Sequence, residues 1–427
     1  MKKLAIGLGV AVFAVVLVAL AVLGLDYALC DDVSAYTRII MHDMYKEDKI
    51  DSIFLGTSHI YRGINPAITD EAWGENTFNC ASALQDIDGS YAWLKEAHKS
   101  ADIDKCYFEL SVRKVKCDKE ERMKETTTTY IIADYMKPSS NRTSFLREAV
   151  NSEDYANAFF RVRRNWKNIY SLETMKDIIA RKRTEEYRNY HSVESYAGKG
   201  FFPLTGKFSR VSTSGTRTIT DDYMSDDYRM YLEKMVSYCK ENDIEFVCFV
   251  SPAPEYTMER TKNYDSFITQ MKEVCGELDV PFYDFNLAKP SILDLEDDDF
   301  MDYNHLNSSG ADKFTKVFAD FFAGKIDGEE LFYDSYAEKK ERLPKRLLGL
   351  NIKRDKEAGI CKVRAVSTKE EKYLYEVWYL NDAGEYELLQ EKSTNRSIAM
   401  PTKGNVQLKV VLYNEKNQKL DEYERKV

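Results

Sequence analysis

Histidine and cysteine are scarce in this sequence. It has five histidines and eight cysteines among 427 residues, and no two cysteines form a C-x-x-C pair. Zinc sites and thioredoxin-type redox centres use closely spaced ligands, so both are excluded and neither a metal nor a cofactor is expected. Cys106 and Cys248 lie in apolar, strand-like runs, where a free cysteine behaves as a small hydrophobic residue. A Cys239–Cys275 disulfide between neighbouring helices stays open as an alternative.

Positive charge is also in short supply. The chain has 61 Lys and Arg against 71 Asp and Glu, a net charge of -10. Nucleic acid is therefore not an expected partner, because binding it requires a cationic surface. Two basic clusters, 161–167 and 181–183, predict a solvated helical face, with contact to an anionic polymer or lipid head groups as the alternative. The acidic run 294–299 lacks the spacing of a calcium loop and predicts a solvated loop.

Long apolar runs are absent except at the N-terminus. Residues 4–25 carry no charge and follow Lys2 and Lys3. This stretch is long enough to cross about 30 Å of hydrocarbon as a helix, whereas a cleaved signal peptide has an apolar region of only about 7–15 residues. The flanking lysines favour the cytoplasmic side. We expect a single-pass cell-membrane protein with a signal anchor at 1–25, a juxtamembrane segment at 26–50 and the bulk of the chain outside the membrane.

Apolar runs of strand length alternate with helical patterns over residues 51–340. This alternation is typical of an α/β domain with a largely parallel sheet. Within it, the polar segment 113–215 predicts an insertion or a lid over one edge of the sheet. The expected strands are 51–57, 77–80, 105–111, 244–250 and 281–285. The expected helices are 86–99, 222–241, 263–279 and 308–323.

The hydrophobic pattern of the sequence changes after Pro344. Residues 345–427 consist of short alternating strands separated by turns. This spacing is typical of a small antiparallel β-sandwich of immunoglobulin type. The chain is therefore expected to carry a separate all-β domain at its C-terminal end.

Two short motifs carry chemistry. The first strand runs directly into Gly56-Thr57-Ser58-His59, which presents a hydroxyl with no ordinary turn signal before it. Near the other end of the α/β domain, Asp302 stands three residues before His305, just ahead of a helix. An Asp in this position can orient one imidazole nitrogen and leave the other for a serine. We predict Ser58 as nucleophile, His305 as base and Asp302 as its orienting partner.

The remaining histidines and one glycine-rich loop are given lesser roles. His59 is expected to be a supporting or surface group, and the other three histidines are expected to be structural. They are His42, His98 and His191. Residues 198–203 place glycines beside aromatic residues. This loop predicts either a packed turn or a contact with sugar rings near the site.

These motifs resemble the SGNH/GDSL hydrolase superfamily, whose first block is Gly-Asp-Ser and whose last block is Asp-x-x-His. The similarity is strongest to membrane-anchored bacterial members such as the alginate acetyltransferases and the D-alanyl-transfer protein of teichoic acid synthesis. The resemblance implies a flavodoxin-like three-layer α/β/α fold with an insertion. It also implies an oxyanion hole built from the Ser58 backbone N–H, Gly56, Asn79 and Gln85. The third block, Gly-x-Asn-Asp, is absent, because the strand at 105–110 is followed by Ser111-Val112-Arg113.

Three functional hypotheses follow. The first is a serine-dependent acyl esterase or O-acyltransferase that acts on a cell-envelope or extracellular polysaccharide through an acyl-enzyme. The second transfers D-alanine or another acyl group together with a membrane-bound O-acyltransferase. The third is a non-catalytic envelope-binding or assembly protein that uses its β-sandwich domain.

Overall fold

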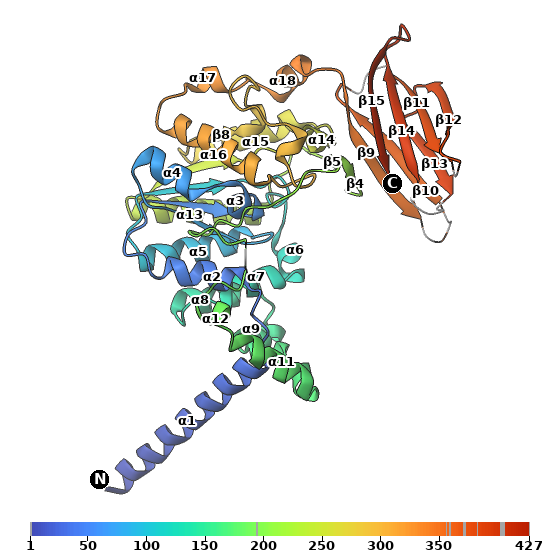
Figure 1. Ribbon diagram of the computed structural model, residues 1–427. Coiled ribbons are helices and arrows are strands. Elements are labelled where there is room, and N and C mark those ends of the chain that lie inside the picture. Colours follow the sequence, from blue (N-terminus) through green and yellow to red (C-terminus); the bar gives the residue numbers. More distant parts are fainter. Residues whose placement is uncertain are drawn as a thin grey trace.

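The computed structural model describes residues 2–193, 195–355, 357, 360–369, 373–381, 383–401 and 406–426. An N-terminal helix projects from one end of an α/β domain, and a β-sandwich lies on the far side of that domain (Figure 1). The molecule therefore has the three parts that the sequence pattern indicates.

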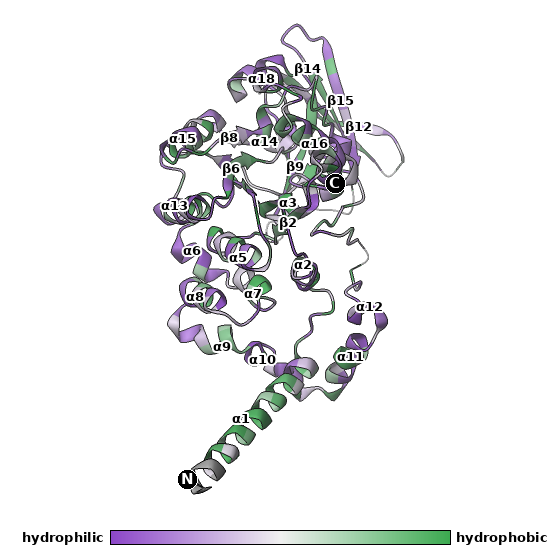
Figure 2. Cartoon of the chain, turned by 90° about the vertical axis from the view of Figure 1, so that its left-hand side faces the viewer, coloured by the Kyte–Doolittle hydropathy of each residue, from purple (hydrophilic) through white to green (hydrophobic). Residues whose placement is uncertain are grey.

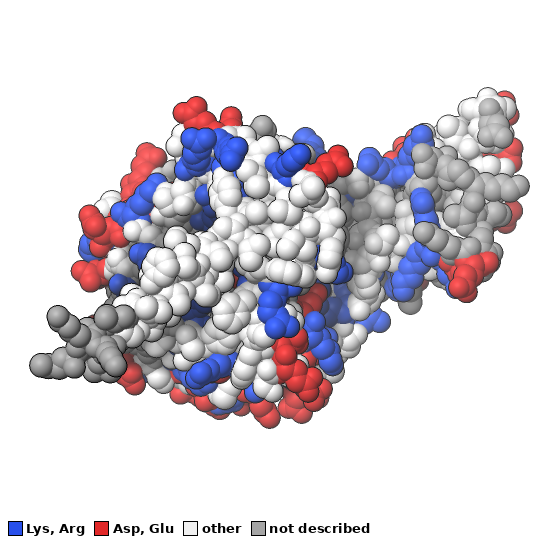
Figure 3. Space-filling view, turned by 90° about the horizontal axis from the view of Figure 1, so that it is seen from below, with Lys and Arg blue, Asp and Glu red and all other residues white. Residues whose placement is uncertain are grey.

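The N-terminal helix α1 spans Lys2–Leu29 and is apolar along most of its length (Figure 2). It is the one helix among the described residues that is long and apolar enough to cross a membrane. Seen from below, it forms an uncharged strip with charged residues of both signs on either side (Figure 3). The helix continues four residues past the predicted end at residue 25, so α1 runs up to the α/β domain without a break in the helix.

Five parallel strands form the central sheet, in the order β2-β1-β3-β6-β8. This is the 2-1-3-4-5 order of flavodoxin-type doubly wound sheets, which bind ligands at the carboxyl ends of their strands. The predicted parallel sheet is confirmed. The strands are β1 (Ser52–Gly56), β2 (Thr77–Ala81), β3 (Lys105–Glu109), β6 (Glu245–Val250) and β8 (Phe282–Asp284).

Helices cover both faces of the sheet, because successive strand side chains point to opposite sides. Tyr107 packs against Phe318 of one helix layer, whereas the neighbouring Cys106 faces Cys239 of the other. Cys275 likewise lies against Cys248, and all eight cysteines are free, so the Cys239–Cys275 disulfide is not formed. The covering helices are α3 (Ser58–Gly63), α4 (Pro66–Trp73), α5 (Ile87–Ser100), α13 (Asp226–Glu241), α15 (Tyr264–Glu277) and α16 (Ser308–Phe322).

The insertion is more helical than expected, and only its two ends line the cavity at the sheet edge. Its helices α7 and α8 pack on α5, and α10 and α11 pack on α1, so the insertion joins the α/β domain to the N-terminal helix (Figure 1). The sequence missed this because short polar helices bury only a narrow apolar stripe. The helices are α6 (Lys119–Lys124), α7 (Thr127–Ala133), α8 (Ser140–Ala149), η1 (Ser152–Asp154), α9 (Tyr155–Phe159), α10 (Arg161–Arg164), η2 (Trp166–Tyr170), α11 (Leu172–Lys182) and α12 (Glu185–Arg188).

The juxtamembrane segment also belongs to the α/β domain. Its helix α2 (Tyr36–Met44) buries Ile40, Met41 and Met44 in the core of that domain. The Trp93 indole N–H contacts the Met44 sulfur at 3.3 Å. Residues 26–50 are therefore not a free tether between the membrane and the domain.

Ion pairs hold the end of α1 to the insertion. Arg161 binds Asp26 at 2.5 Å and Asp32 at 2.9 Å, and Lys182 binds Asp32 at 2.9 Å. The Lys182 side chain is only 1% exposed, so this ion pair is buried. We call the following residues the anchor cluster: Asp26, Asp31, Asp32, Arg161, Arg181 and Lys182. The prediction of a solvated basic face is wrong for Arg161 and Lys182, since Asp26 and Asp32 neutralise them, whereas Arg181 stays partly exposed.

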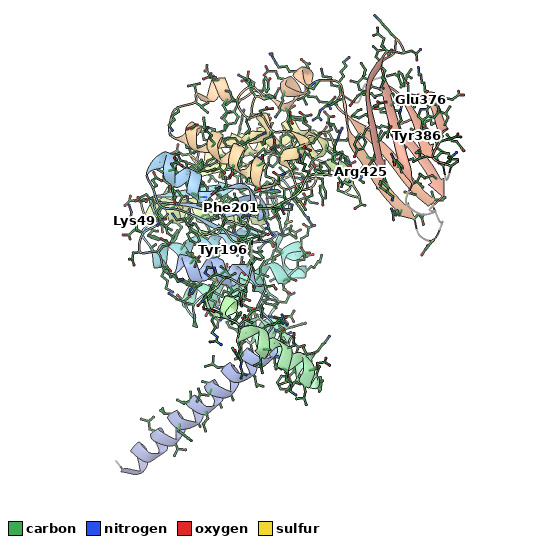
Figure 4. All side chains as sticks on the ribbon, in the orientation of Figure 1. Lys49, Tyr196, Phe201, Glu376, Tyr386 and Arg425 are labelled. Atoms are coloured by element: carbon green, nitrogen blue, oxygen red, sulfur yellow. The ribbon has the colours of Figure 1, made fainter. Side chains whose placement is uncertain are left out.

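The C-terminal domain is a sandwich of two four-stranded sheets, β13-β10-β9-β4 and β12-β11-β14-β15. Glu376, Tyr386 and Arg425 mark the second sheet in Figure 4. All pairings are antiparallel except β4 with β9, in which the insertion supplies the strand Val211–Ser212. The other strands are β9 (Leu347–Asp355), β10 (Ile360–Ser367), β11 (Leu374–Leu380), β12 (Tyr386–Ser393), β13 (Ser397–Pro401), β14 (Gln407–Tyr413) and β15 (Lys419–Lys426).

Short elements connect the two domains. Arg346, at the start of the sandwich, binds Asp297 at 2.8 Å and Glu255 at 2.9 Å. The sandwich is thus attached to the loop that carries the last sequence motif. The remaining elements are β5 (Arg217–Thr218), β7 (Thr261–Lys262), α14 (Glu255–Met258), η3 (Phe285–Leu287), η4 (Asp297–Asp299), α17 (Gly328–Leu331) and α18 (Tyr336–Arg342).

Candidate active site

Ser58 is presented at the carboxyl end of a central strand. Strand β1 ends at Gly56, Thr57 caps the short helix α3 with its side chain, and Ser58 is the first residue of that helix. The Ser58 side chain is largely buried, and its Oγ lies 2.8 Å from His305 Nε2. A strand that runs straight into a capped helix therefore fixes the hydroxyl without an intervening loop.

Asp302 orients the His305 ring from its other side. Its Oδ2 lies 2.9 Å from His305 Nδ1, and its Oδ1 accepts the backbone N–H groups of Asn304 and His305 at 2.7 and 2.8 Å. Burial alone would raise the pKa of the Asp302 carboxyl, but these hydrogen bonds lower that pKa below its ordinary value of 3.8. The carboxylate is therefore charged, holds a proton on Nδ1 and leaves Nε2 to accept from the serine. The structure brings together all three residues of the predicted triad.

The acidic run holds the His305 loop in place. Asp299 is buried, binds Lys313 of α16 at 2.7 Å and accepts a hydrogen bond from Ser309 at 2.9 Å. Asp297 binds Arg346 of the sandwich. The prediction of a solvated loop is wrong for Asp297 and Asp299, because their cationic partners come from the following helix and the next domain.

A second histidine–carboxylate pair lies beside Ser58. Glu109 ends strand β3, is fully buried, and places Oε1 2.5 Å from His59 Nδ1. Its Oε2 accepts the backbone N–H and the hydroxyl of Thr57 at 2.7 and 2.8 Å. A side chain at Gly56 would bring its Cβ within 2.6 Å of Glu109, so only glycine fits there. Glu109 thus fixes the residues on both sides of Ser58.

The two groups of this pair are charged. Burial alone would lower the pKa of His59, but Glu109 raises that pKa above its ordinary value of 6.5. Burial would raise the pKa of Glu109, but His59 and Thr57 lower it below 4.5. His59 is therefore a supporting group, as expected, but with a buried partner that sequence reasoning missed. The available signal was a lone acid at the end of the apolar strand 105–110.

The oxyanion donors inferred from the resemblance are not free. Asn79 is fully buried and its side-chain amide donates to the Ile64 carbonyl at 2.9 Å. The Gln85 amide is also buried and donates to Ser90 and to the Cys80 carbonyl. Gly56 lies against Glu109 and does not line the cavity beside Ser58. The assignment of Asn79, Gln85 and Gly56 to the oxyanion hole is therefore wrong, because both side-chain amides donate hydrogen bonds within the core and Gly56 lies outside the cavity.

Two backbone groups can replace those donors. Neither the Ser58 nor the Leu84 backbone N–H donates a hydrogen bond within the described part of the chain. Leu84 lines the same cavity as Ser58 and has φ of 51°, a left-handed conformation that costs energy for a non-glycine residue. Such strain is found where the backbone must point a group at a site.

The glycine-rich loop 198–203 forms a packed turn. Phe201 and Phe202 are buried, and a Cβ at Gly200 would lie 2.2 Å from the Asn79 carbonyl oxygen. Tyr196 lies beside α2 (Figure 4) and its hydroxyl contacts Asp43 at 2.5 Å. The loop therefore supports the α/β core, and the alternative of a sugar-binding surface is not met.

The other histidines lie away from the triad. His42 stacks on Tyr190, and His98 Nδ1 lies 2.8 Å from the Tyr238 hydroxyl. His191 is exposed and does not line the cavity beside Ser58. No group of three or more potential metal ligands occurs among the described residues.

A cavity of about 810 Å³ opens above Ser58. It is bounded by the segments that follow β1, β2 and β3, by residues 214–225 and by Tyr303 and Asn304. Ligands of doubly wound sheets bind at this edge. The arrangement can therefore bring a substrate carbonyl to an activated serine.

Comparisons with known proteins name no relative. No protein-family model matches the sequence, and no curated protein matches it. Among solved structures, a Cellulomonas fimi endo-beta-1,4-mannanase double mutant is similar at 11% identity over 93% of this chain and 99% of that one. Its TM-score of 0.16 is too low to indicate a common fold.

Proposed function

We propose that this protein is a membrane-anchored serine acyl esterase or O-acyltransferase with an α/β domain of SGNH type and an immunoglobulin-like sandwich. One observation carries the proposal. Ser58 Oγ lies 2.8 Å from His305 Nε2, and the other ring nitrogen of His305 lies 2.9 Å from Asp302. This is the geometry in which a histidine removes a serine proton.

The reaction has two steps. His305 takes the Ser58 proton while Oγ attacks the acyl carbonyl carbon, and Asp302 stabilises the imidazolium. The Ser58 and Leu84 N–H groups stabilise the oxyanion. The tetrahedral intermediate then expels the alcohol, which takes the proton from His305 and leaves an acyl-enzyme. A water or a sugar hydroxyl gives a proton to His305 and attacks the ester carbonyl, and the second tetrahedral intermediate expels Ser58 Oγ, which takes that proton back from His305.

The cavity favours a short acyl group on a polar carrier. Apart from Leu84, Gly215 and two tyrosines, its wall consists of polar and charged residues, so Leu84 is the one aliphatic side chain it offers to a long acyl chain. An acylated cell-envelope polysaccharide fits this wall. With α1 in the cell membrane, the site lies near the outer surface, where a membrane-bound O-acyltransferase can supply the acyl group, D-alanyl included. Hydrolysis and transfer differ only in the acceptor of the acyl-enzyme.

Labelling with a fluorophosphonate tests the proposal. The detergent-solubilised chain should be labelled, and Ser58→Ala should lose the label without a change in melting temperature. Ser111→Ala is the matched control, because Ser111 lines the same cavity and its hydroxyl makes no hydrogen bond within the described residues. Label retained on Ser58→Ala would move the nucleophile elsewhere. A wild-type chain that never reacts would favour the non-catalytic envelope-binding alternative.

A further inference from the structure

A second cavity lies where the N-terminal helix α1 meets the α/β domain. Its volume is about 480 Å³, and its walls include residues of α1, α2, α8, α9 and α10. None of the residues that line it also lines the cavity beside Ser58, so the proposed reaction leaves this second cavity without a role.

One wall of the second cavity is apolar. Val22 and Leu23 of α1 contribute to it, and so does Phe160 of α10, which is 56% exposed. Val22 and Leu23 lie near the domain end of the uncharged stretch 4–25, which is long enough to match about 30 Å of hydrocarbon. With α1 in a membrane, the cavity therefore lies at the boundary between the hydrocarbon and the head groups.

Exposed aromatic residues lie beside the same end of α1. Trp166 and Tyr170 belong to η2 and are 44% and 83% exposed. The η2 segment is attached to the end of α1, because the Asn168 side chain donates to the Leu29 carbonyl at 2.7 Å. Helices α10 and α11 pack on α1 as well (Figure 2). Tryptophan and tyrosine are enriched where membranes meet water, so this surface is suited to lipid head groups.

The carboxylates on the cavity wall already bind cations. Asp26 and Asp32 bind Arg161 at 2.5 and 2.9 Å. Asp134 binds Arg164. These carboxylates are therefore not available to the other two arginines of the wall.

Those two arginines, Arg38 and Arg142, are half-buried and make no ion pair within the described part of the chain. Arg142 donates its Nε–H to the Ala133 carbonyl at 2.7 Å. All other arginines of the insertion that are not exposed bind carboxylates. They are Arg122, Arg161, Arg164, Arg181 and Arg210. The charge of Arg142 is therefore left for a ligand.

Arg38 is fixed by aromatic rings. Its guanidinium carbon lies 3.7 Å from the centre of the Tyr187 ring and 4.0 Å from that of Tyr190, and its Nη2 donates to the Tyr187 carbonyl at 3.2 Å. Its Nη1 is buried without a hydrogen-bond partner, and no other guanidinium or ammonium nitrogen of the described residues shares this state. A buried donor without an acceptor costs free energy, so an anion beside Arg38 would be stabilising.

We infer that this cavity binds the phosphate head group of a phospholipid from the surrounding membrane through Arg38 and Arg142. The acyl chains would lie against Val22, Leu23 and Phe160. Guanidinium groups bind phosphate oxygens through two parallel hydrogen bonds, and basic pockets beside membrane helices suit lipid head groups. The bound lipid would hold the α/β domain at a fixed depth. This inference needs α1 in a membrane but does not depend on Ser58.

Thermal shifts of the full-length chain in an uncharged detergent test the inference. The probes are dioctanoyl phosphatidylglycerol, dioctanoylglycerol, which lacks the phosphate, and glycerol 1-phosphate, which lacks the chains. The phospholipid should raise the melting temperature by at least about 2 °C in a saturable manner, and the other two probes should not. An equal shift with dioctanoylglycerol would indicate binding of the chains alone, and an equal shift with glycerol 1-phosphate would indicate a site for free phosphate. Either result overturns the inference.

A double variant locates the effect. Arg38→Gln/Arg142→Gln should raise the phospholipid concentration at half-maximal shift at least about 10-fold. The matched control, Arg147→Gln/Lys316→Gln, removes the same charge from two exposed residues outside the cavity and should behave as wild type. If circular dichroism shows that the double variant is unfolded, Arg142→Gln alone decides, with an expected rise of at least about 3-fold. An unchanged concentration overturns the inference.

Tryptophan quenching tests the position of the surface in a bilayer. Helix α1 contains no tryptophan, so brominated lipids in nanodiscs report on the rest of the chain. Trp166→Phe should lose most of the quenching, whereas Trp378→Phe should keep it, because Trp378 lies in the sandwich. Full quenching in Trp166→Phe, or a chain that does not enter nanodiscs, overturns the inference. Ser58→Ala should bind the phospholipid as wild type does, so failure of the proposed reaction would leave this site intact.

Discussion

At the level of single residues, the His59–Glu109 pair acts on the positions that flank the nucleophile. Glu109 holds Thr57 through two hydrogen bonds and His59 through one. Because it makes these contacts from a buried strand, we expect Glu109 to position Ser58 without touching substrate.

Replacing both His59 and Glu109 by glutamine should change how the stability of the fold depends on pH. The raised pKa of His59, which faces Glu109 and Asp302, stabilises the fold below its unfolded value of 6.5, and this stability is lost as pH rises through the folded pKa. The lowered pKa of Glu109 stabilises the fold above its unfolded value of 4.5, and this contribution is lost only as the pH falls through the folded pKa. The difference in melting temperature between wild type and His59→Gln/Glu109→Gln should therefore be largest near pH 6 and smaller towards about pH 9. A constant difference would contradict the charged pair.

Asp302→Asn should show whether the reaction needs a correctly oriented His305 ring or only the presence of that ring. The amide keeps the shape but can hold the wrong imidazole tautomer, so the rate of phosphonate labelling should fall by at least about 10²-fold. Circular dichroism and melting temperature should stay close to wild type, because the Asp302 side chain is 42% exposed. Wild-type labelling of this variant would show that His305 needs no orienting carboxylate.

The triad could be found from the sequence because each part is a local motif at the end of an element. Glu109 could not, since its partners lie about 50 residues away and meet it only through the pairing of β1 with β3. Asn79 was misassigned for a similar reason. The loop at Gly200 packs on its backbone, and Ile64 accepts its amide.

At the level of elements, the start of α16 determines how close His305 lies to Ser58. Asn307 caps this helix, and a Cβ at Gly310 would lie 2.1 Å from the Asp299 carbonyl oxygen. Gly310→Ala should therefore push the His305 loop away from Ser58, lower the melting temperature by several degrees and slow phosphonate labelling.

Gly276→Ala is the matched control for that substitution. Gly276 also lies in a helix, α15, but has no atom within 4 Å of its added Cβ. The Gly276→Ala substitution should stabilise the protein by about 0.5–1 kcal/mol, because alanine has a higher helix propensity than glycine. Equal effects of the two substitutions would show that helix propensity alone acts at Gly310.

Strands and long helices of the α/β domain were predictable because their apolar periodicity is strong and local. The insertion was not, since its helices gain order from ion pairs with distant residues such as Asp26 and Asp32. Strand β4 was missed as well. Two residues that join a sheet of another domain leave no periodic signal.

At the level of the whole molecule, the anchor cluster should protect residues 30–35 from protease. Arg161→Gln/Lys182→Gln removes three ion pairs to Asp26 and Asp32, so limited proteolysis of detergent-solubilised protein should cut this segment faster. Arg163→Gln is the control, because Arg163 is exposed on the same helix and forms no ion pair within the described residues. Equal cutting in all three proteins would show that the cluster does not order the segment.

Because α1 ends at Leu29 inside the anchor cluster, α1 and the α/β domain should move as one rigid body. A helix of 28 residues is about 42 Å long, more than the roughly 30 Å of hydrocarbon in a bilayer. Its excess length ends inside the anchor cluster, so a tilt of the buried part swings the whole head by the same angle. The proposed active site would therefore sit at the end of a rigid arm above the lipid surface, and a substrate of the proposed enzyme would have to reach Ser58 at that distance from the membrane.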